Sequence, residues 1–371
     1  MFKVFRHRVY QSAGFTLTEL LVSLVVASIF LLATGMIVIE TMRVDREETG
    51  RTQVQAELTQ AMQYIQQDLA EALYIYNDAE QPNGDGTPDL IQRLYTPGWI
   101  RRPDGAIPVV AFWKLNPIPR DCYQGPPTLQ QIREGRVTLK ERPTGISEAD
   151  WDNIRSRRNI YTLVVYYLRR NYNNAGNPDG NTPWEGNARI ARFELQPFNG
   201  TCIERSPFFR VDPDPYRQGF LDWPAEKDLQ DLERRGTPQE PIAAAGNRGP
   251  RLVTLVSNIF SSRQGSPQVA PPCPQGYALG GGLPNGVTFS GLEVNQNDVG
   301  FHVCVRRSAA ARLPQDVIVT ITATAMERAN PGLFRRYIQD ATSVDAEQVS
   351  RYLTTMQTQV LARGVFNRRQ A

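Results

Sequence analysis

The sequence has 371 residues, with 41 lysines and arginines, 38 aspartates and glutamates, and a formal net charge of +3. Three of the basic residues, Lys3, Arg6 and Arg8, lie in residues 1–14, which contain no acid, so the rest of the chain has equal numbers of both signs. A neutral chain has no field that draws it to nucleic acid, and we expect no nucleic-acid partner. The length allows one large or two small domains.

The first structural element expected is a membrane-spanning helix at residues 15–39. These 25 residues carry a single charge, Glu19. At 1.5 Å per residue they are long enough to cross a hydrocarbon layer about 30 Å thick. Because basic flanks stay in the cytoplasm, the residues after Ile39 are expected on the far side of the membrane.

Glu19 is unusual because a carboxylate inside an apolar span is costly, and such residues are usually paired and functional. Cleavage between Gly14 and Phe15 would create an α-amino group at Phe15, four residues before Glu19. A neighbouring copy shifted by about one helical turn places its amine on this carboxylate. Charge pairing of this kind favours assembly of several chains.

The stretch Gly14-Phe15-Thr16-Leu17-Thr18-Glu19, after a short basic leader and before about 20 apolar residues, resembles the class III signal of type IV pilins and type II secretion pseudopilins. The resemblance implies that a prepilin peptidase cuts after Gly14 and N-methylates Phe15, and that Glu19 directs docking into a filament. It places a single-pass anchor in the inner membrane and the head in the periplasm. Two other interpretations stay open: a secretory signal cut after Gly35, and a plain single-pass anchor.

A long amphipathic helix is predicted to continue the span as a stalk over residues 40–76. This stretch has no proline and one glycine, Gly50. Its apolar residues recur at steps of three and four, which defines one helical stripe: Val54, Leu58, Met62, Ile65, Leu69, Leu73 and Tyr76. The stalk is expected to pack on a globular head.

Beyond residue 76 the hydrophobic pattern changes from helical to strand-like. Asn159–Arg170 and Asn187–Gln196 flank an Asn/Gly-rich loop as an antiparallel hairpin. Further strands are expected at Ile107–Leu115, Arg136–Lys140, Leu252–Phe260, Val287–Val294, Val299–Arg306 and Asp316–Ala325. Residues 198–250 form an irregular insertion rich in Pro and Gly, with a short helix at Ala225–Arg234.

Helical spacing returns at Val344–Arg363, where Val349, Tyr352, Leu353, Met356 and Val360 share one face. The predicted fold class is therefore α+β: a long N-terminal helix on an antiparallel β-rich head, with a C-terminal helix. The predicted divisions are a leader (1–14), a membrane or filament-core helix (15–39), a stalk (40–76), a head (77–343), and a C-terminal helix and tail (344–371).

The four cysteines, Cys122, Cys202, Cys273 and Cys304, all follow the span and show no Cys-x-x-Cys spacing. Outside the cytoplasm they indicate up to two disulfides with three connectivities; we favour Cys122 with Cys202 and Cys273 with Cys304. Asn83, Asp85 and Asp89 around Gly86 resemble part of a calcium loop, although the expected first ligand is replaced by Gln81. Ordinary turns remain the competing interpretation, and no other cofactor is expected.

The sequence gives no indication of an active site, and we predict that the protein is not an enzyme. His7 lies in the leader, His302 lies in a predicted strand, and neither a Gly-x-Ser-x-Gly nor a His-Glu-x-x-His motif occurs. A pair of catalytic carboxylates distant in sequence stays open. An alternative to filament assembly is a tethered glycan-binding module, in which sugars stack on Trp99, Trp113, Trp151, Trp184 or Trp223.

Two shorter resemblances narrow the functional prediction. The strand ending Tyr166-Tyr167-Leu168-Arg169 and the following loop and strand resemble the head of minor subunits of the PilW or PulJ type. The tail from Tyr352 to Arg363 resembles pseudopilins of cyanobacterial hormogonium polysaccharide secretion. They imply a minor subunit of a type IV pilus-like or type II secretion-like filament, with an exported polysaccharide as a partner and gliding motility as the process.

Overall fold

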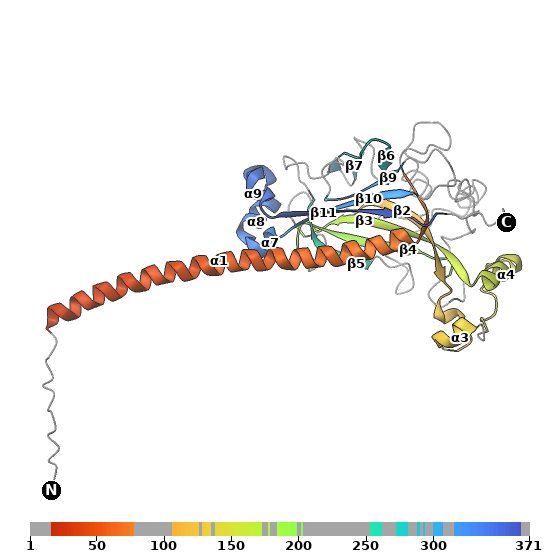
Figure 1. The fold of residues 1–371 in the computed structure, drawn as a ribbon, viewed down its shortest axis with the longest axis horizontal. Coiled ribbons are helices and arrows are strands. Elements are labelled where there is room, and N and C mark those ends of the chain that lie inside the picture. The colour runs from red at the N-terminus through yellow and green to blue at the C-terminus, as the bar shows by residue number, and fades with distance from the viewer. Residues whose placement is uncertain are drawn as a thin grey trace, which may run out of the picture.

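The computed structural model shows a long helix that carries a β-rich head (Figure 1). It describes residues 16–77, 106–125, 128–134, 138–172, 177–178, 184–198, 202, 253–261, 272–280, 288–289, 292–293, 300–306 and 315–364. The structural statements below concern these residues. The fold is α+β, as predicted, with short helices near the C-terminal end of the chain.

Helix α1 (Leu17–Ala70) has 54 residues and a length of about 80 Å at 1.5 Å per residue. Its N-terminal half projects away from the head, and its C-terminal half lies along it (Figure 1). The predicted stripe forms the contact: Val54, Leu58, Met62, Ile65 and Leu69 are between 0% and 3% exposed. Burying five such side chains stabilises the docked helix by on the order of 10 kcal/mol before entropy is counted.

The predicted end of the stalk near Asn77 was wrong by about two turns. The helix ends at Ala70, and residues Ala72–Ile75 form strand β1, which pairs antiparallel with β2. Nothing in this stretch breaks a helix locally. Ala-Leu-Tyr-Ile also suits a strand, and pairing with β2 overrides the helical spacing.

The head is built on one nine-stranded sheet in the order β1-β2-β3-β4-β5-β10-β9-β6, with β11 also paired to β10. Its pairings are antiparallel. The remaining strands are β2 (Ala106–Pro117), β3 (Asn159–Arg170), β4 (Ala188–Leu195), β5 (Val253–Ile259), β6 (Tyr277–Leu279), β9 (Phe301–Arg306), β10 (Asp316–Thr324) and β11 (Leu353–Leu361), and a separate pair is β7 (Thr288–Phe289) with β8 (Leu292–Glu293).

The predicted hairpin at the centre of the head is confirmed by the pairing of β3 with β4, from Leu163 opposite Leu195 to Arg170 opposite Ala188. Most other predicted strands also form within a few residues of their expected bounds. Within Arg136–Lys140 the structure describes only an isolated bridge from Leu139 to Tyr123. The predicted helix at Ala225–Arg234 lies outside the described residues.

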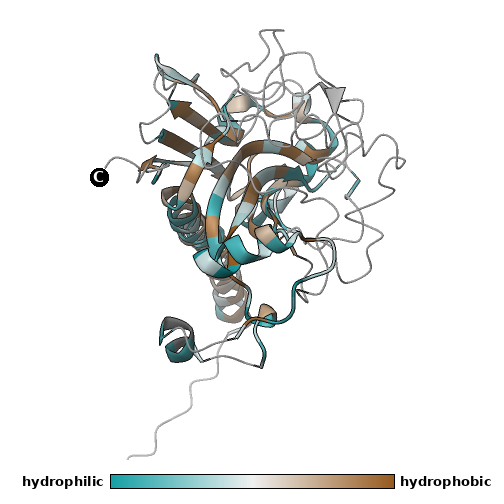
Figure 2. Cartoon of the chain, turned by 90° about the vertical axis from the view of Figure 1, so that its right-hand side faces the viewer, coloured by the Kyte–Doolittle hydropathy of each residue, from teal (hydrophilic) through white to brown (hydrophobic). Residues whose placement is uncertain are grey.

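The sheet curls until its first strand meets the end of β10 and β11. The Gln315 side-chain amide donates to Ile75 O and accepts from Ile75 N, both at 2.7 Å, and so takes the place of a neighbouring strand for β1. Gly364 N donates to Ala72 O at 3.1 Å. Viewed end-on, the apolar strands curve through the head (Figure 2). One continuous core lies between α1 and the concave face.

Gly300 marks a close backbone approach where β9 and β5 share one edge of β10. Its N–H donates to Phe260 O, and its carbonyl accepts from Thr322 N. A Cβ at this position would lie against the Phe260 carbonyl oxygen and 2.6 Å from the Thr322 carbonyl oxygen. Only glycine fits between these two backbones.

The short helices gather at the two ends of the head (Figure 1). α7 (Met326–Ala329), α8 (Pro331–Gln339) and α9 (Ala346–Ser350) lie where α1 leaves the head; α3 (Leu129–Glu134) and α4 (Glu148–Arg157) lie at the opposite end. Short 3-10 helices occupy Arg120–Cys122 and Ala341–Ser343. The first group packs in its own apolar cluster with Phe260.

The predicted C-terminal helix over Val344–Arg363 was correct only for its first turn. Helix α9 ends at Ser350, and Leu353–Leu361 is strand β11, paired with β10 along its whole length. Spacing of three and four in this stretch coexists with an alternation of exposed and covered residues. Pairing to the β-branched strand β10 decides between the two, because short apolar patterns are compatible with either structure.

Candidate assembly helix and its anchors in the head

The N-terminal end of α1 is organised by Glu19. Thr16 is the N-cap: its Oγ1 accepts from Glu19 N at 3.3 Å, and Glu19 Oε2 accepts from Thr16 N at 3.1 Å. This reciprocal arrangement is a capping box. Thr16 Oγ1 also donates to Oε2 at 3.0 Å, and Oε1 receives no hydrogen bond from any residue that the structure describes. One carboxylate oxygen is thus open to a donor from another chain.

The other polar side chains of the projecting half satisfy themselves. Four hydroxyls donate to a backbone carbonyl three or four residues earlier, at 2.7–2.9 Å, and they belong to Ser23, Ser28, Thr34 and Thr41. Such back-bonding removes the cost of a hydroxyl in an apolar medium. The Thr18 hydroxyl pairs with Thr16 Oγ1 at 3.1 Å. Glu19 is therefore the one group in the span with unused capacity for a strong polar contact.

The projecting half of α1 presents apolar side chains all round. Leu24, Phe30, Leu32 and Met36 are between 66% and 74% exposed. α1 is the one helix among the described residues that is long and apolar enough to cross a membrane, and none of its most apolar window is buried. A helix that is hydrophobic on every side requires lipid or other helices around it.

The first anchor of α1 in the head lies where the helix meets α7. Gly50 is buried, and a Cβ there would lie 3.2 Å from Arg328 Cβ. Arg328 Nη2 contacts Glu57 Oε1 at 2.8 Å and Glu185 Oε2 at 2.5 Å. The hydrogen bond from Arg328 lowers the pKa of Glu185. Next to it, Arg51 Nη2 donates to Arg351 O at 2.6 Å.

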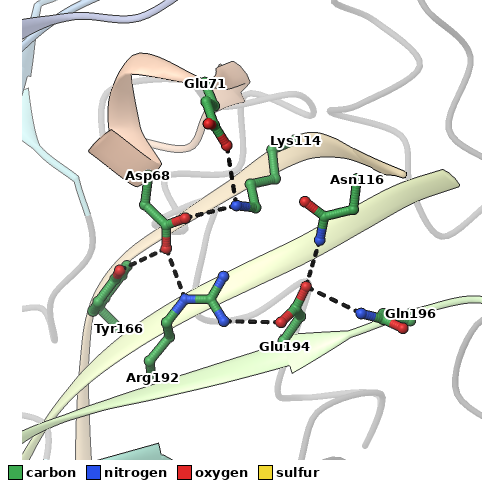
Figure 3. A network of polar contacts seen from close by, with 8 residues as sticks. All are labelled: Asp68, Glu71, Lys114, Asn116, Tyr166, Arg192, Glu194 and Gln196. Atoms are coloured by element: carbon green, nitrogen blue, oxygen red, sulfur yellow. Dashed lines mark hydrogen bonds and ion pairs between the residues drawn. The ribbon is translucent and has the colours of Figure 1, made fainter. Parts of the chain in front are cut away.

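The second anchor is a buried charge cluster at the last turn of α1 (Figure 3). Asp68 Oδ1 accepts from Lys114 Nζ of β2 at 2.7 Å. Asp68 Oδ2 accepts from Arg192 Nε of β4 at 2.7 Å and from Tyr166 OH of β3 at 2.7 Å. The side chains of Asp68, Lys114 and Arg192 are only 7–10% exposed. The cluster joins the helix to three strands.

Peripheral carboxylates complete the cluster. Glu71 contacts Lys114 at 3.3 Å, and Glu194 contacts Arg192 at 2.9 Å (Figure 3). Burial opposes ionisation of Asp68, but the charge of Arg192 and the hydrogen bonds from Lys114, Tyr166 and Arg192 outweigh it and lower the pKa of the carboxyl. Burial and the neighbouring Asp68 charge raise the pKa of Tyr166 far above its usual value. Asp68 is held ionised and Tyr166 neutral, which suits a structural joint.

Sequence reasoning missed both anchors, although it contained a signal for one of them. Asp68 lies three residues after Ile65, on the apolar stripe of the stalk, and Lys114 interrupts the apolar run of a predicted strand. A charge on a buried face requires a partner of opposite sign. Which cation meets which carboxylate depends on strand order, and that order was not predicted.

The structure joins Cys122 to Cys202 and Cys273 to Cys304, the pairing that the sequence favoured. The first bridge lies in an apolar cluster with α4 at the far end of the head, and the second ties the segment before β6 to β9. Apart from Glu19, the other predicted processing and metal-binding residues lie outside the described residues. These are the processing residues Gly14 and Phe15 and the calcium candidates Asn83, Asp85 and Asp89.

The aromatic and histidine candidates are mostly internal. Trp113 and Trp151 are 0% and 4% exposed, so these two are core residues and do not offer the stacking surface that the alternative of a glycan-binding module requires. Trp184 is 38% exposed, with the Arg189 guanidinium 5.5 Å from its ring. Trp99 and Trp223 lie outside the described residues. His302 is 5% exposed in β9, and burial lowers its pKa to about 4.

Comparison with known proteins gives one finding. Residues 10–35 match the family model of the prokaryotic N-terminal methylation motif, the signal of type IV pilins and pseudopilins. This chain carries a pilin-type N-terminal signal. The match covers the last five residues of the predicted leader, the capping box and most of the predicted span, and so includes Gly14, Phe15 and Glu19. No curated protein and no solved structure matches the chain.

The motif supports a pilin-like or pseudopilin subunit, and so a structural subunit rather than an enzyme. It implies processing by a prepilin peptidase and assembly with other pilins. The N-terminal apolar helix is consistent with an inner-membrane anchor.

Proposed function

We propose that this protein is a minor pseudopilin, which is incorporated into or initiates a type IV pilus-like or type II secretion-like filament. One observation carries the proposal: the methylation motif runs directly into a 54-residue helix whose first half is unburied and whose second half is anchored in a head. The head stands in the periplasm before assembly and in the envelope filament afterwards.

The mechanism assigns separate tasks to the two oxygens of Glu19. Oε2 caps the start of its own helix, while Oε1 accepts a hydrogen bond from the methylated α-amino group of Phe15 of a neighbouring subunit. In an apolar surrounding, an uncompensated carboxylate costs several kcal/mol, and pairing removes that cost. Subunits are therefore selected in the register in which the amine and the carboxylate meet.

The test replaces Glu19 by Ala in the full-length chain, in cells that assemble the filament. We expect normal membrane insertion and processing, with loss of the protein from purified filaments. Glu48→Ala is the matched control, because Glu48 is an exposed carboxylate of the same helix beyond the span; it should be incorporated normally. Normal incorporation of Glu19→Ala, or a mature N-terminus other than methylated Phe15, contradicts the mechanism.

The cargo is a separate part of the proposal. The resemblance of the tail at residues 352–363 supports export of a polysaccharide during gliding. Deletion of the gene should then abolish the extracellular polysaccharide and gliding together. If the deletion strain instead loses an exported protein and makes normal extracellular polysaccharide, the proposed cargo is wrong and the filament belongs to another secretion machine.

A further inference from the structure

Strand β11 has a long outer edge that is not protected in the usual ways. In the part of the chain that the structure describes, β11 pairs with β10 alone. Its nine residues match β10 one for one, from Leu353 opposite Thr324 to Leu361 opposite Asp316, with no bulge. In an antiparallel ladder every second residue turns its N–H and C=O away from the partner strand. The outer edge of β11 therefore presents a regular row of unused backbone donors and acceptors.

Proteins normally protect such an edge with charge, proline, a bulge, shortness or a cover. The other described ends of this sheet follow that rule: β6 has only three residues, and the edge of β1 is met by Gln315 and Gly364. β11 contains Leu-Thr-Thr-Met-Gln-Thr-Gln-Val-Leu, with neither a charge nor a proline. Its residues Thr355, Gln357, Gln359 and Leu361 are exposed.

We propose that this edge binds an extended segment of a neighbouring filament subunit, which adds a strand to the sheet. The inference rests on the proposed filament function. β11 begins beside the point where α1 leaves the head, since Arg51 on α1 contacts the carbonyl of Arg351. The edge therefore begins on the same side of the head as the projecting apolar helix, whose last exposed apolar residue, Val44, lies seven residues or about 10 Å before Arg51. Uncharged Thr and Gln residues suit strand addition.

The direction of β11 decides against a second copy of the same strand as the antiparallel partner. Contacts to α1 advance together along both elements: Arg51 with Arg351, Thr59 with Met356, Gln66 with Thr358, and Ala70 with Arg363. β11 therefore runs in the same sense as α1. If two copies of β11 paired antiparallel, the N-terminal helices of the two chains would point in opposite directions. Subunits of one filament, however, enter the membrane from the same side. We therefore assign the added strand to a different pilin-like chain.

The first test is photo-crosslinking in cells that assemble the filament, with benzoylphenylalanine incorporated into the full chain. The probe replaces exposed Gln357 on β11, Val25 in the projecting helix, or Gln130 on α3 at the far end of the head. We expect Gln357 to crosslink to another subunit that carries an N-terminal methylation motif, and Gln130 to give no such product. Crosslinking from Val25 shows that the chain is in the filament.

The outcomes separate the two proposals. If Val25 crosslinks to pilin-like subunits and Gln357 does not, or if Gln357 reaches only a second copy of this chain, strand addition is overturned while the filament function stands. If Val25 also gives no product, the filament function and the inference that rests on it both fail.

A second test blocks the edge without relying on a probe. Gln357→Pro and Thr358→Pro are made separately, because of two successive residues one directs its N–H to β10 and the other directs it outward. The variant whose melting temperature stays near wild type has lost only the outward N–H. We expect that variant to be incorporated about tenfold less, the ratio that corresponds to 1.4 kcal/mol. Unchanged incorporation of the well-folded variant overturns the proposal.

Discussion

The replacement Asp68→Ala tests whether the buried charge cluster fixes α1 to the head. In the wild-type protein this carboxylate accepts hydrogen bonds from Lys114, Arg192 and Tyr166, each at 2.7 Å. Its removal leaves Lys114 and Arg192 with side chains only 10% exposed and with the peripheral acids Glu71 and Glu194 as their remaining partners.

Removing one partner of a buried ion pair costs about 3–5 kcal/mol, because an uncompensated charge stays in the interior. The peripheral acids reduce that penalty, so we expect about 3 kcal/mol for Asp68→Ala, at the lower end of the range. Since the pKa of Asp68 is lowered in the folded protein, its contribution is present above about pH 4, the value of an unfolded aspartate, and is lost as pH falls through the folded pKa. The difference between variant and wild type should therefore shrink below pH 4.

The assay is urea unfolding of the full chain in detergent micelles, followed by near-UV circular dichroism at pH 7 and at pH 3. Asp152→Ala is the matched control: Asp152 pairs with Arg155 on α4, and both side chains are more than half exposed. A surface pair of this kind contributes about 0–1 kcal/mol. If Asp68→Ala costs no more than the control, or if its cost does not fall in acid, the cluster is not the anchor described above.

Two further predictions concern the sheet. Gly300→Ala forces a methyl group against the carbonyl oxygens of Phe260 and Thr322 and should lower the free energy of unfolding by about 3 kcal/mol or more. The control is Gly35→Ala, where no atom lies within 4 Å, and it should leave the stability of the head unchanged in the same urea assay. Equal effects of the two substitutions would refute the close-approach argument. Because burial lowers the pKa of His302 to about 4, the unfolded chain binds more protons between pH 6.5 and 4, and stability should fall by about 2 kcal/mol from pH 7 to pH 5. His302→Gln should remove most of this loss of stability between pH 7 and pH 5. If the variant has the same pH dependence as the wild-type protein, the prediction is wrong.

The parts of the fold that could be predicted from sequence are those set by local pattern. A run of 25 residues with one charge and the stripe from Val54 to Leu69 define α1 without reference to the rest of the chain. The hairpin of β3 and β4 is similar, because two β-branched and aromatic segments flank one loop. In each case neighbouring residues carry the whole signal.

The parts that failed depend on partners far away in sequence. Residues 72–75 and 353–361 have spacings that suit a helix, and they became strands because β2 and β10 offered edges to pair with. The same limit applies to the anchors: nothing near Asp68 in the sequence names Lys114, 46 residues later, as its partner. The methylation signal, in contrast, is contiguous, and for that reason the sequence alone was sufficient to predict it.

The two anchors also explain how the proposed assembly through the N-terminal end of α1 would orient the head. A hydrophobic stripe is non-directional, so by itself it permits α1 to rotate or to shift along the sheet. Glu57 and Asp68, 11 residues and about 16 Å apart on the helix, meet fixed cations from α7, β2 and β4. A shift by one turn would break both sets of contacts at once. Because α1 is continuous from Leu17 to Ala70, the direction in which Glu19 faces is coupled to the orientation of the head. In the filament that we propose, the register selected by Glu19 would therefore also determine which neighbour the edge of β11 meets.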